Sequence, residues 1–145
     1  MGRGAGAPAG RRQARPPAAG QNRGRHRDLL QKHFLDLGGM GLRELRQRGH
    51  DILLLAGPTM DLDGTIAVYR WANATRQATD SLVPAEEMQR IFDVPHGHGP
   101  TAGRDRAEGM ALLDDQHILI VFDSPADARK TAANDIVADS YRLPD

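Results

Sequence analysis

Acidic side chains close to a glycine are the first candidates for chemistry in this sequence. Asp61, Asp63 and Gly64 form an Asp-x-Asp-Gly fragment, which matches the beginning of a calcium-binding loop. Such a loop also needs a bidentate glutamate about nine residues after the second aspartate, where position 72 is an alanine. A turn between two strands needs only aspartate side chains that accept backbone hydrogen bonds. We therefore expect a turn here and keep a divalent cation as the alternative.

The histidines are the next candidates. His96 and His98 lie in the segment HGHG and can both reach one zinc or nickel ion if this loop curls. Neutral imidazoles in a glycine-rich loop make a poor site without a nearby carboxylate or cysteine, so we expect both in solvent. His50 and His117 each precede an apolar segment, and we expect them to act in turns.

The charges of the chain are unevenly distributed, although its net charge is zero. Residues 1–27 carry seven arginines and no acid, whereas residues 28–145 carry twelve basic and nineteen acidic side chains. The first segment consists largely of Arg, Gly, Pro and Ala, a composition that cannot bury enough surface to offset the entropy of ordering. We predict a disordered arm over 1–27. It could attract phosphates, but no aromatic residue is interleaved to stack on bases, so nucleic acid is not an expected partner.

Composition also limits the cellular setting. The chain has no cysteine, which excludes disulfides and thiolate metal sites and agrees with a reducing compartment. No apolar run approaches the length of a bilayer span, and the N-terminus lacks the apolar region of a secretory signal. We expect a soluble, cytoplasmic protein that does not enter a membrane.

The elements that must position these side chains are predicted to be strands. Short apolar runs, broken by Gly, Pro, Asp and Asn every 8–12 residues, are typical of an all-β chain. The continuously apolar run 52–58 predicts a strand covered on both faces. The segments 72–84 and 96–105 are expected to be connections, with one helical turn after Pro84. The remaining expected strands are 33–37, 41–49, 65–71 and 87–95.

Two stretches of the chain follow one plan. Residues 41–58 and 109–125 each place a glycine before a short apolar-containing run, a polar turn, an apolar core and a stop, and Tyr69-Arg70 has a counterpart in Tyr141-Arg142. We predict repeats over about 33–95 and 106–143, within a domain 28–145. Repeated antiparallel sheets must stack on neighbours, and propellers do this with four to eight blades, whereas about two fit here. The chain is then part of a larger propeller, an open pair of sheets, or a protein that self-associates or binds a partner chain to cover its open blade faces.

The motifs LAGPTMDLDG, YRW and EGMALL resemble the C-terminal part of a bacterial family of propeller-like domains of unknown function. The resemblance covers about residues 33–143, and this chain has Ala107 where the family tends to have proline. It implies a partial β-propeller of about two blade-like antiparallel sheets, and fold more than activity.

Placement in a propeller would give several charged side chains a role. Glu108 precedes the first strand of a repeat, an end that lies beside the central channel of propellers, where a carboxylate can bind a divalent cation. Asp123 could face the same channel. Arg43 and Arg106 could bind a carboxylate or phosphate there. Alternatively Glu108 binds loop amides, and the arginines pair with Glu108 or Asp61 and only fix loops.

No motif for a serine hydrolase, a nucleotide enzyme or a zinc protease occurs in the chain. Tyr69 and Trp71 share one face of a strand and could stack on a ligand, but core packing is the expectation. The sequence therefore predicts an uncharacterised, non-enzymatic propeller-type scaffold or binding module, or a truncated remnant of one. The alternative is a metal-assisted hydrolase that uses Glu108, by similarity to propeller-fold sugar-lactone hydrolases in the Glu-Gly pair alone.

Overall fold

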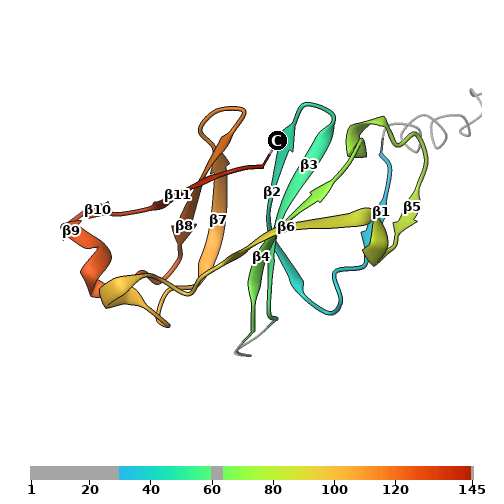
Figure 1. Cartoon of the computed structure of the whole chain (residues 1–145). Helices are drawn as coiled ribbons and strands as arrows, with labels where there is room; N and C mark the ends of the chain where they lie inside the picture. The colour runs from blue at the N-terminus through green and yellow to red at the C-terminus, as the bar shows by residue number, and fades with distance from the viewer. Residues whose placement is uncertain (1–29, 60–63, 145) are drawn as a thin grey trace, which may run out of the picture. The chain divides into compact units, whose positions relative to one another are not determined.

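A computed structural model describes residues 30–59 and 64–144 (Figure 1). The arm 1–27, which was predicted to be disordered, lies outside the described residues, as do Asp61 and Asp63. Residues 32–145 form one compact unit. It is all-β, as the sequence predicted, with short 3-10 helices between strands. The strands are β1 His33–Leu35, β2 Gly41–Arg48, β3 Asp51–Gly57, β4 Ile66–Trp71, β5 Ser81–Val83, β6 Met88–Val94, β7 Ala107–Leu112, β8 His117–Phe122, β9 Lys130–Ala132, β10 Asp135–Ile136 and β11 Asp139–Arg142.

The first sheet is antiparallel and has the strand order β2-β3-β4-β6. Its centre is β3, in which the four residues Leu53–Ala56 are fully buried, so the prediction of a strand covered on both faces is confirmed. Side chains alternate between two cores, because successive residues of a strand point to opposite faces. Ile66 and Val68 of β4 lie in one core, and Ala67, Tyr69 and Trp71 lie in the other.

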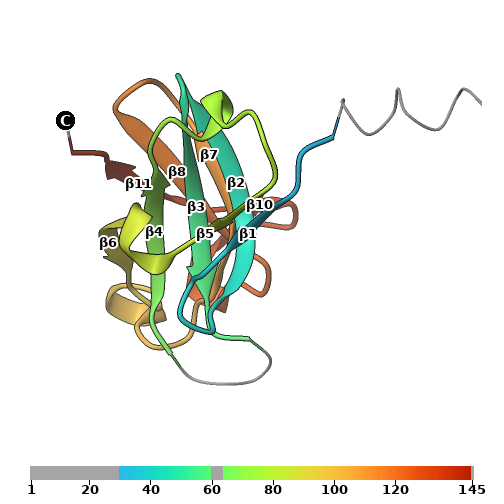
Figure 2. The same ribbon diagram turned by 90° about the vertical axis from the view of Figure 1, so that its right-hand side faces the viewer.

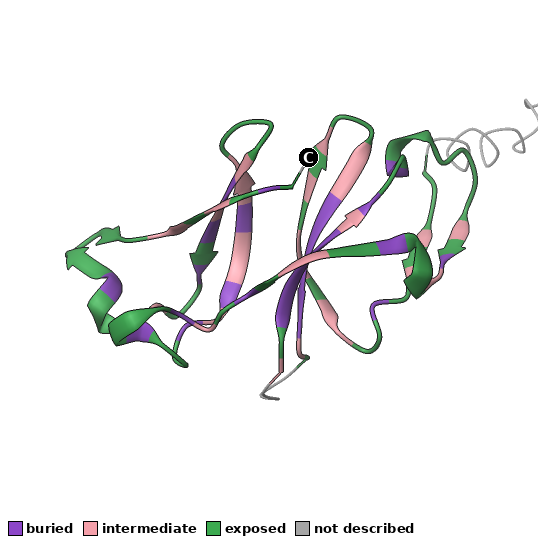
Figure 3. Cartoon of the chain, viewed as in Figure 1, coloured by how far each residue is buried: buried purple, intermediate pink, exposed green. Residues whose placement is uncertain are grey.

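The second sheet is antiparallel and has the order β11-β8-β7. Ile118, Ile120 and Phe122 of β8 lie in the same core as Leu53 and Leu55 of β3. The two sheets therefore pack against each other through a shared apolar layer. Figure 3 shows that the strands of both sheets carry buried residues. The opposite face of the second sheet, which carries Leu119 and Val121, is only partly covered.

A short ribbon covers the other face of the first sheet. Strands β1 and β5 pair in parallel, with Phe34 opposite Leu82 (Figure 2). Their neighbours Leu35, Leu37 and Val83 pack into the core that holds Trp71, whose ring meets His33 edge to face at 5.1 Å. The expectation that Tyr69 and Trp71 are core residues is thus confirmed.

Some elements differ from the sequence-based expectation. The connection 72–84 contains β5, and the long connection after β8 contains the two-stranded ribbon β9–β10. These strands are two or three residues long and mostly exposed, so they produce no hydrophobic period. The helical turn expected after Pro84 is the 3-10 helix η3, Ala85–Glu87. The other described 3-10 helices are η2 Ala74–Arg76, η4 Gly99–Thr101 and η5 Asp127–Arg129.

Each sheet contains a bulge in its first strand. The register of β2 against β3 shifts between Leu42 and Glu44, which leaves Arg43 as the extra residue. The register of β7 against β8 shifts between Ala107 and Gly109, which leaves Glu108 as the extra residue. A bulge redirects the side chain of the extra residue, so regular alternation along β2 is interrupted at Arg43.

Candidate functional site

The two bulged residues meet. Arg43 of β2 donates a hydrogen bond from Nη1 to Oε1 of Glu108 in β7, and from Nη2 to the carbonyl of Pro58 at 2.7 Å. Gly57 permits this approach, because a Cβ there would lie 2.6 Å from Arg43 Nε. That Nε is buried and has no hydrogen-bond partner among the described residues. Pairing between Arg43 and Glu108 is one of the two arrangements expected from the sequence.

Asp123 and Arg106 are the other predicted site residues that the structure describes, and both lie outside the Arg43–Glu108 ion pair. Glu108 itself lies inside β7 and not before it, because the strand begins at Ala107. Asp123 is exposed in a bend after β8, which is the middle strand of its sheet and not the inner one. Within the described part of the chain, no hydrogen bond or ion pair links Asp123 to Glu108. Arg106 donates to the carbonyls of Gly103 and Asp105 in its own loop, both at 3.2 Å.

Among residues 30–59 and 64–144, no group of three or more His, Asp or Glu side chains is arranged to hold a metal ion. The His50 ring lies 3.4 Å from the Thr75 hydroxyl, and the His117 ring lies 2.9 Å from the Asp114 carboxylate, within their turns. In the same ranges, no helix is long and apolar enough to cross a membrane.

A buried ion network lies beside the second sheet. The sequence analysis did not predict it. Arg129 of η5 donates from Nε to Asp105 Oδ2 at 2.6 Å, and from both terminal nitrogens to the two oxygens of Asp139 at 2.7 Å each. Its guanidinium also lies 4.0 Å from the centroid of the Phe122 ring. Asp105 is fully buried. The network ties the loop between the sheets to the connection before β11.

The electrostatics of this network follow from its hydrogen bonds. Burial raises the pKa of Asp105, but the Ala126 amide, the Arg129 guanidinium and the Thr101 hydroxyl bond to it and bring the net pKa below 3.8. Hydrogen bonds to Asp139 and Asp105 raise the pKa of Arg129 above its usual value, against the effect of burial. Asp105 and Arg129 are therefore charged at neutral pH, and the one guanidinium bonds to the side chains of both Asp105 and Asp139.

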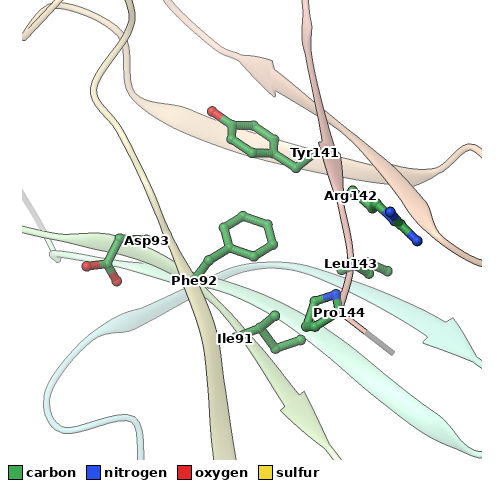
Figure 4. A pocket seen from close by; sticks show the side chains of 7 residues that line it. All are labelled: Ile91, Phe92, Asp93, Tyr141, Arg142, Leu143 and Pro144. Atoms are coloured by element: carbon green, nitrogen blue, oxygen red, sulfur yellow. The ribbon is translucent and has the colours of Figure 1, made fainter.

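The network continues toward an apolar groove. His98 Nε2 lies 3.6 Å from Asp139 Oδ2 and 3.2 Å from the Tyr141 hydroxyl. Burial, and then the charge of Asp139, raise the pKa of Tyr141 to about 12. The Tyr141 ring stacks on Phe92 of β6 at 5.3 Å between centroids. Beside this pair, residues 91–93 and 141–144 line a groove of about 580 Å³ (Figure 4).

Only part of this second region had a signal in the sequence. His98 was considered with His96 as a metal ligand, and Tyr141 was noted only as the counterpart of Tyr69 in the second repeat. Asp105 and Arg129 lie 24 positions apart in two polar connections, where no spacing marks either as buried. Burial of such a charge has a high free-energy cost unless the tertiary fold brings an oppositely charged side chain close to it.

No curated protein and no solved structure matches this chain. A family model described as a protein of unknown function, DUF3616, matches residues 19–139, which cover both sheets up to the beginning of β11. The chain therefore belongs to the DUF3616 family of proteins of unknown function.

Proposed function

We propose that this chain is a non-enzymatic, propeller-type binding module, in which the two sheets are successive blades. The observation that carries the proposal is the shared core. Leu53 and Leu55 of the first sheet pack against Ile118 and Ile120 of the second, as adjacent blades of a propeller do. The inner edge strands β2 and β7 meet at the Arg43–Glu108 pair.

The backbone register supports reading the sheets as two copies of one unit. Leu45 is opposite Leu54 and follows the bulged Arg43 by two positions. Met110 is opposite Ile120 and follows the bulged Glu108 by two positions. Leu54 and Ile120 therefore correspond. Leu54 lies in the core that also contains Leu35 of β1, and Ile120 lies in the core shared with the first sheet. Each of the two side chains thus faces the element that precedes its own sheet in the chain.

This correspondence changes two details of the sequence alignment. It matches Gly109 with Glu44 instead of Gly41, because Gly109 is opposite Val121 and Glu44 is opposite Leu55, the residue that corresponds to Val121. It matches Tyr141, opposite Ile118, with Trp71, opposite Ile52. The sequence comparison had instead matched Tyr141 with Tyr69.

The pairing of Glu108 favours a binding module over the metal-assisted hydrolase. A carboxylate that already accepts a hydrogen bond from Arg43 has part of its charge compensated, and a cation bound there would lie close to a guanidinium. We expect purified protein to contain no stoichiometric divalent metal. Elemental analysis tests this, with Glu108→Gln as the matched variant. A bound metal in the wild type that is lost in Glu108→Gln would contradict the proposal and support the hydrolase.

The open face of the second sheet supports self-association as part of the same proposal. Val121 is 37% exposed and Leu113 is 56% exposed, whereas Leu55, which corresponds to Val121, is fully buried between the sheets. We propose that a second copy of the chain covers this face. We also propose a cytoplasmic location, as expected from the amino-acid composition. Light scattering during size-exclusion chromatography should report a mass above that of the monomer.

Two variants make that test specific. Val121→Glu places a charge on the open face and should return the protein to monomers. Leu42→Glu, at an exposed leucine of β2, is the matched control and should not. A wild-type protein that stays monomeric at every concentration would contradict self-association.

A further inference from the structure

The two sheets differ in strand number, and this difference coincides with the groove. The described residues give the first sheet four strands and the second sheet three. In the correspondence above, β11 takes the place of β4, and the position that β6 occupies beside β4 has no counterpart beside β11. The backbone edge of β11 that points away from β8 therefore has no strand partner among the described residues.

The groove lies where that fourth strand would be. One wall is the end of β11 with Leu143 and Pro144, and the other is Ile91–Asp93 of β6 (Figure 4). Both walls belong to edge strands, and the side chains that approach one another between them are the apolar Phe92, Tyr141 and Ile91. Its volume of about 580 Å³ is within the range of ligand-binding sites, roughly 300–1,000 Å³.

The charges at the groove indicate what kind of strand would fit. Tyr141 faces the shared core, so Arg142, its neighbour in β11, points to the other face of the sheet. Arg142 is exposed and has no ion pair with any other described residue, whereas Asp93 on the facing wall is paired with Arg90 at 2.5 Å. A strand added beside β11 would place one side chain next to Arg142 on the same face, where an acidic residue is favourable.

We propose that this groove binds an extended peptide segment, which adds as a fourth strand to the free edge of β11. The segment has apolar residues at alternate positions facing Phe92 and Tyr141, and an acidic residue beside Arg142. Backbone hydrogen bonds to β11 supply affinity, and the alternating side chains supply specificity, as in other cases of strand addition. This inference deepens the proposed function and rests on it for the correspondence of the two sheets.

The chain itself provides a suitable probe. Residues 87–95, EMQRIFDVP, contain β6, which is the strand that occupies this position in the first sheet, and they carry apolar and acidic residues. A synthetic peptide of this sequence with blocked ends is titrated into the isotope-labelled full chain, and amide hydrogen exchange is followed by NMR. We expect exchange of the β11 amides to slow by about tenfold or more at saturation, as new hydrogen bonds protect them.

One modified peptide and three variants separate strand addition from general adhesion. The same peptide with N-methylated backbone amides should not protect β11, because it cannot donate the required hydrogen bonds. Pro144→Glu, at an exposed wall residue, and Arg142→Glu should each weaken binding at least about tenfold if the contacts are as proposed. Leu82→Glu, at an exposed leucine of β5, is the matched control and should bind like the wild type. Unchanged denaturation curves establish that the variants are folded.

Several results would overturn the inference. They are an unchanged exchange rate in β11, equal binding of the N-methylated peptide, or equal losses in Leu82→Glu and Pro144→Glu. Protection of β11 that rises with protein concentration without peptide would identify a second copy as the occupant and also overturn it. Because the mass and metal measurements use the chain without peptide, failure of this test is distinguishable from failure of the proposed function.

Discussion

Arg43 and Glu108 are each the extra residue of a bulge, one in β2 and one in β7, and their side chains pair between the two strands. Neither side chain would reach this position in a regular strand, because a bulge redirects the residue that it adds. The two side chains of the pair also differ in their exposure to solvent. Arg43 is largely buried and keeps a second acceptor in the Pro58 carbonyl, while the Glu108 side chain is 39% exposed.

The two halves of this pair should contribute unequally to stability. Glu108→Gln should lower the free energy of unfolding by about 1 kcal/mol or less, because solvent screens the exposed carboxylate. Arg43→Ala should cost more, about 2–4 kcal/mol, because it also removes packing and a buried hydrogen bond. Urea denaturation of both single variants and the double variant measures their coupling. Additive effects would show that the two side chains do not interact in solution.

Asp105 should make the protein sensitive to acid. Its pKa is below 3.8 in the folded protein and near 3.8 in the unfolded chain, so the unfolded state binds a proton first as the pH falls. Its contribution to stability is therefore fully present above pH 3.8 and is lost as the pH falls through the lower, folded value. Asp105→Asn should lower stability at neutral pH, by about 3–5 kcal/mol for a broken buried pair, and flatten the acid limb. Urea denaturation between neutral and acid pH measures both, and an acid limb as steep as that of the wild type would refute this role.

Gly97 should be far less tolerant of substitution than its neighbour Gly99. Both have positive φ, +87° and +50°, but only at Gly97 would a Cβ meet other atoms, at 2.2 Å from the Thr101 carbonyl oxygen and 2.7 Å from Asp105 Oδ2. Gly99→Ala should cost about 1–2 kcal/mol from backbone strain alone. Gly97→Ala should cost clearly more and disturb the ion network. Thermal denaturation compares the two, and equal losses would mean that the loop relaxes around the new methyl group.

Trp71 should be one of the largest single contributors to stability. It is 4% exposed and packs between the first sheet and the β1–β5 ribbon. Trp71→Ala should lower the free energy of unfolding by about 3–5 kcal/mol, as expected for truncation of a buried aromatic residue. Its Nε1 is buried without a hydrogen-bond partner among the described residues, so Trp71→Phe should be much milder. A melting temperature that is unchanged in Trp71→Ala would contradict this packing.

The long strands were predictable because each carries its own periodic signal. The run 52–58 is apolar at successive positions, and a strand with both faces covered needs such a run. The expected strand 65–71 placed Tyr69 and Trp71 on one face, and both side chains lie in the same core. By contrast, β5, β9 and β10 depend on neighbours elsewhere in the chain and have no such signal.

The all-β class, the main strands and the burial of Trp71 could be predicted from the sequence, because they follow from local alternation of apolar and polar residues. The Arg43–Glu108 pair, the Asp105–Arg129–Asp139 network and the groove between β6 and β11 arise only when distant strands pack together. Charged side chains have no period that marks their partners. Whether a charge lies in solvent or in a buried pair depends on which distant strand is packed beside it, and on bulges that redirect one residue at a time.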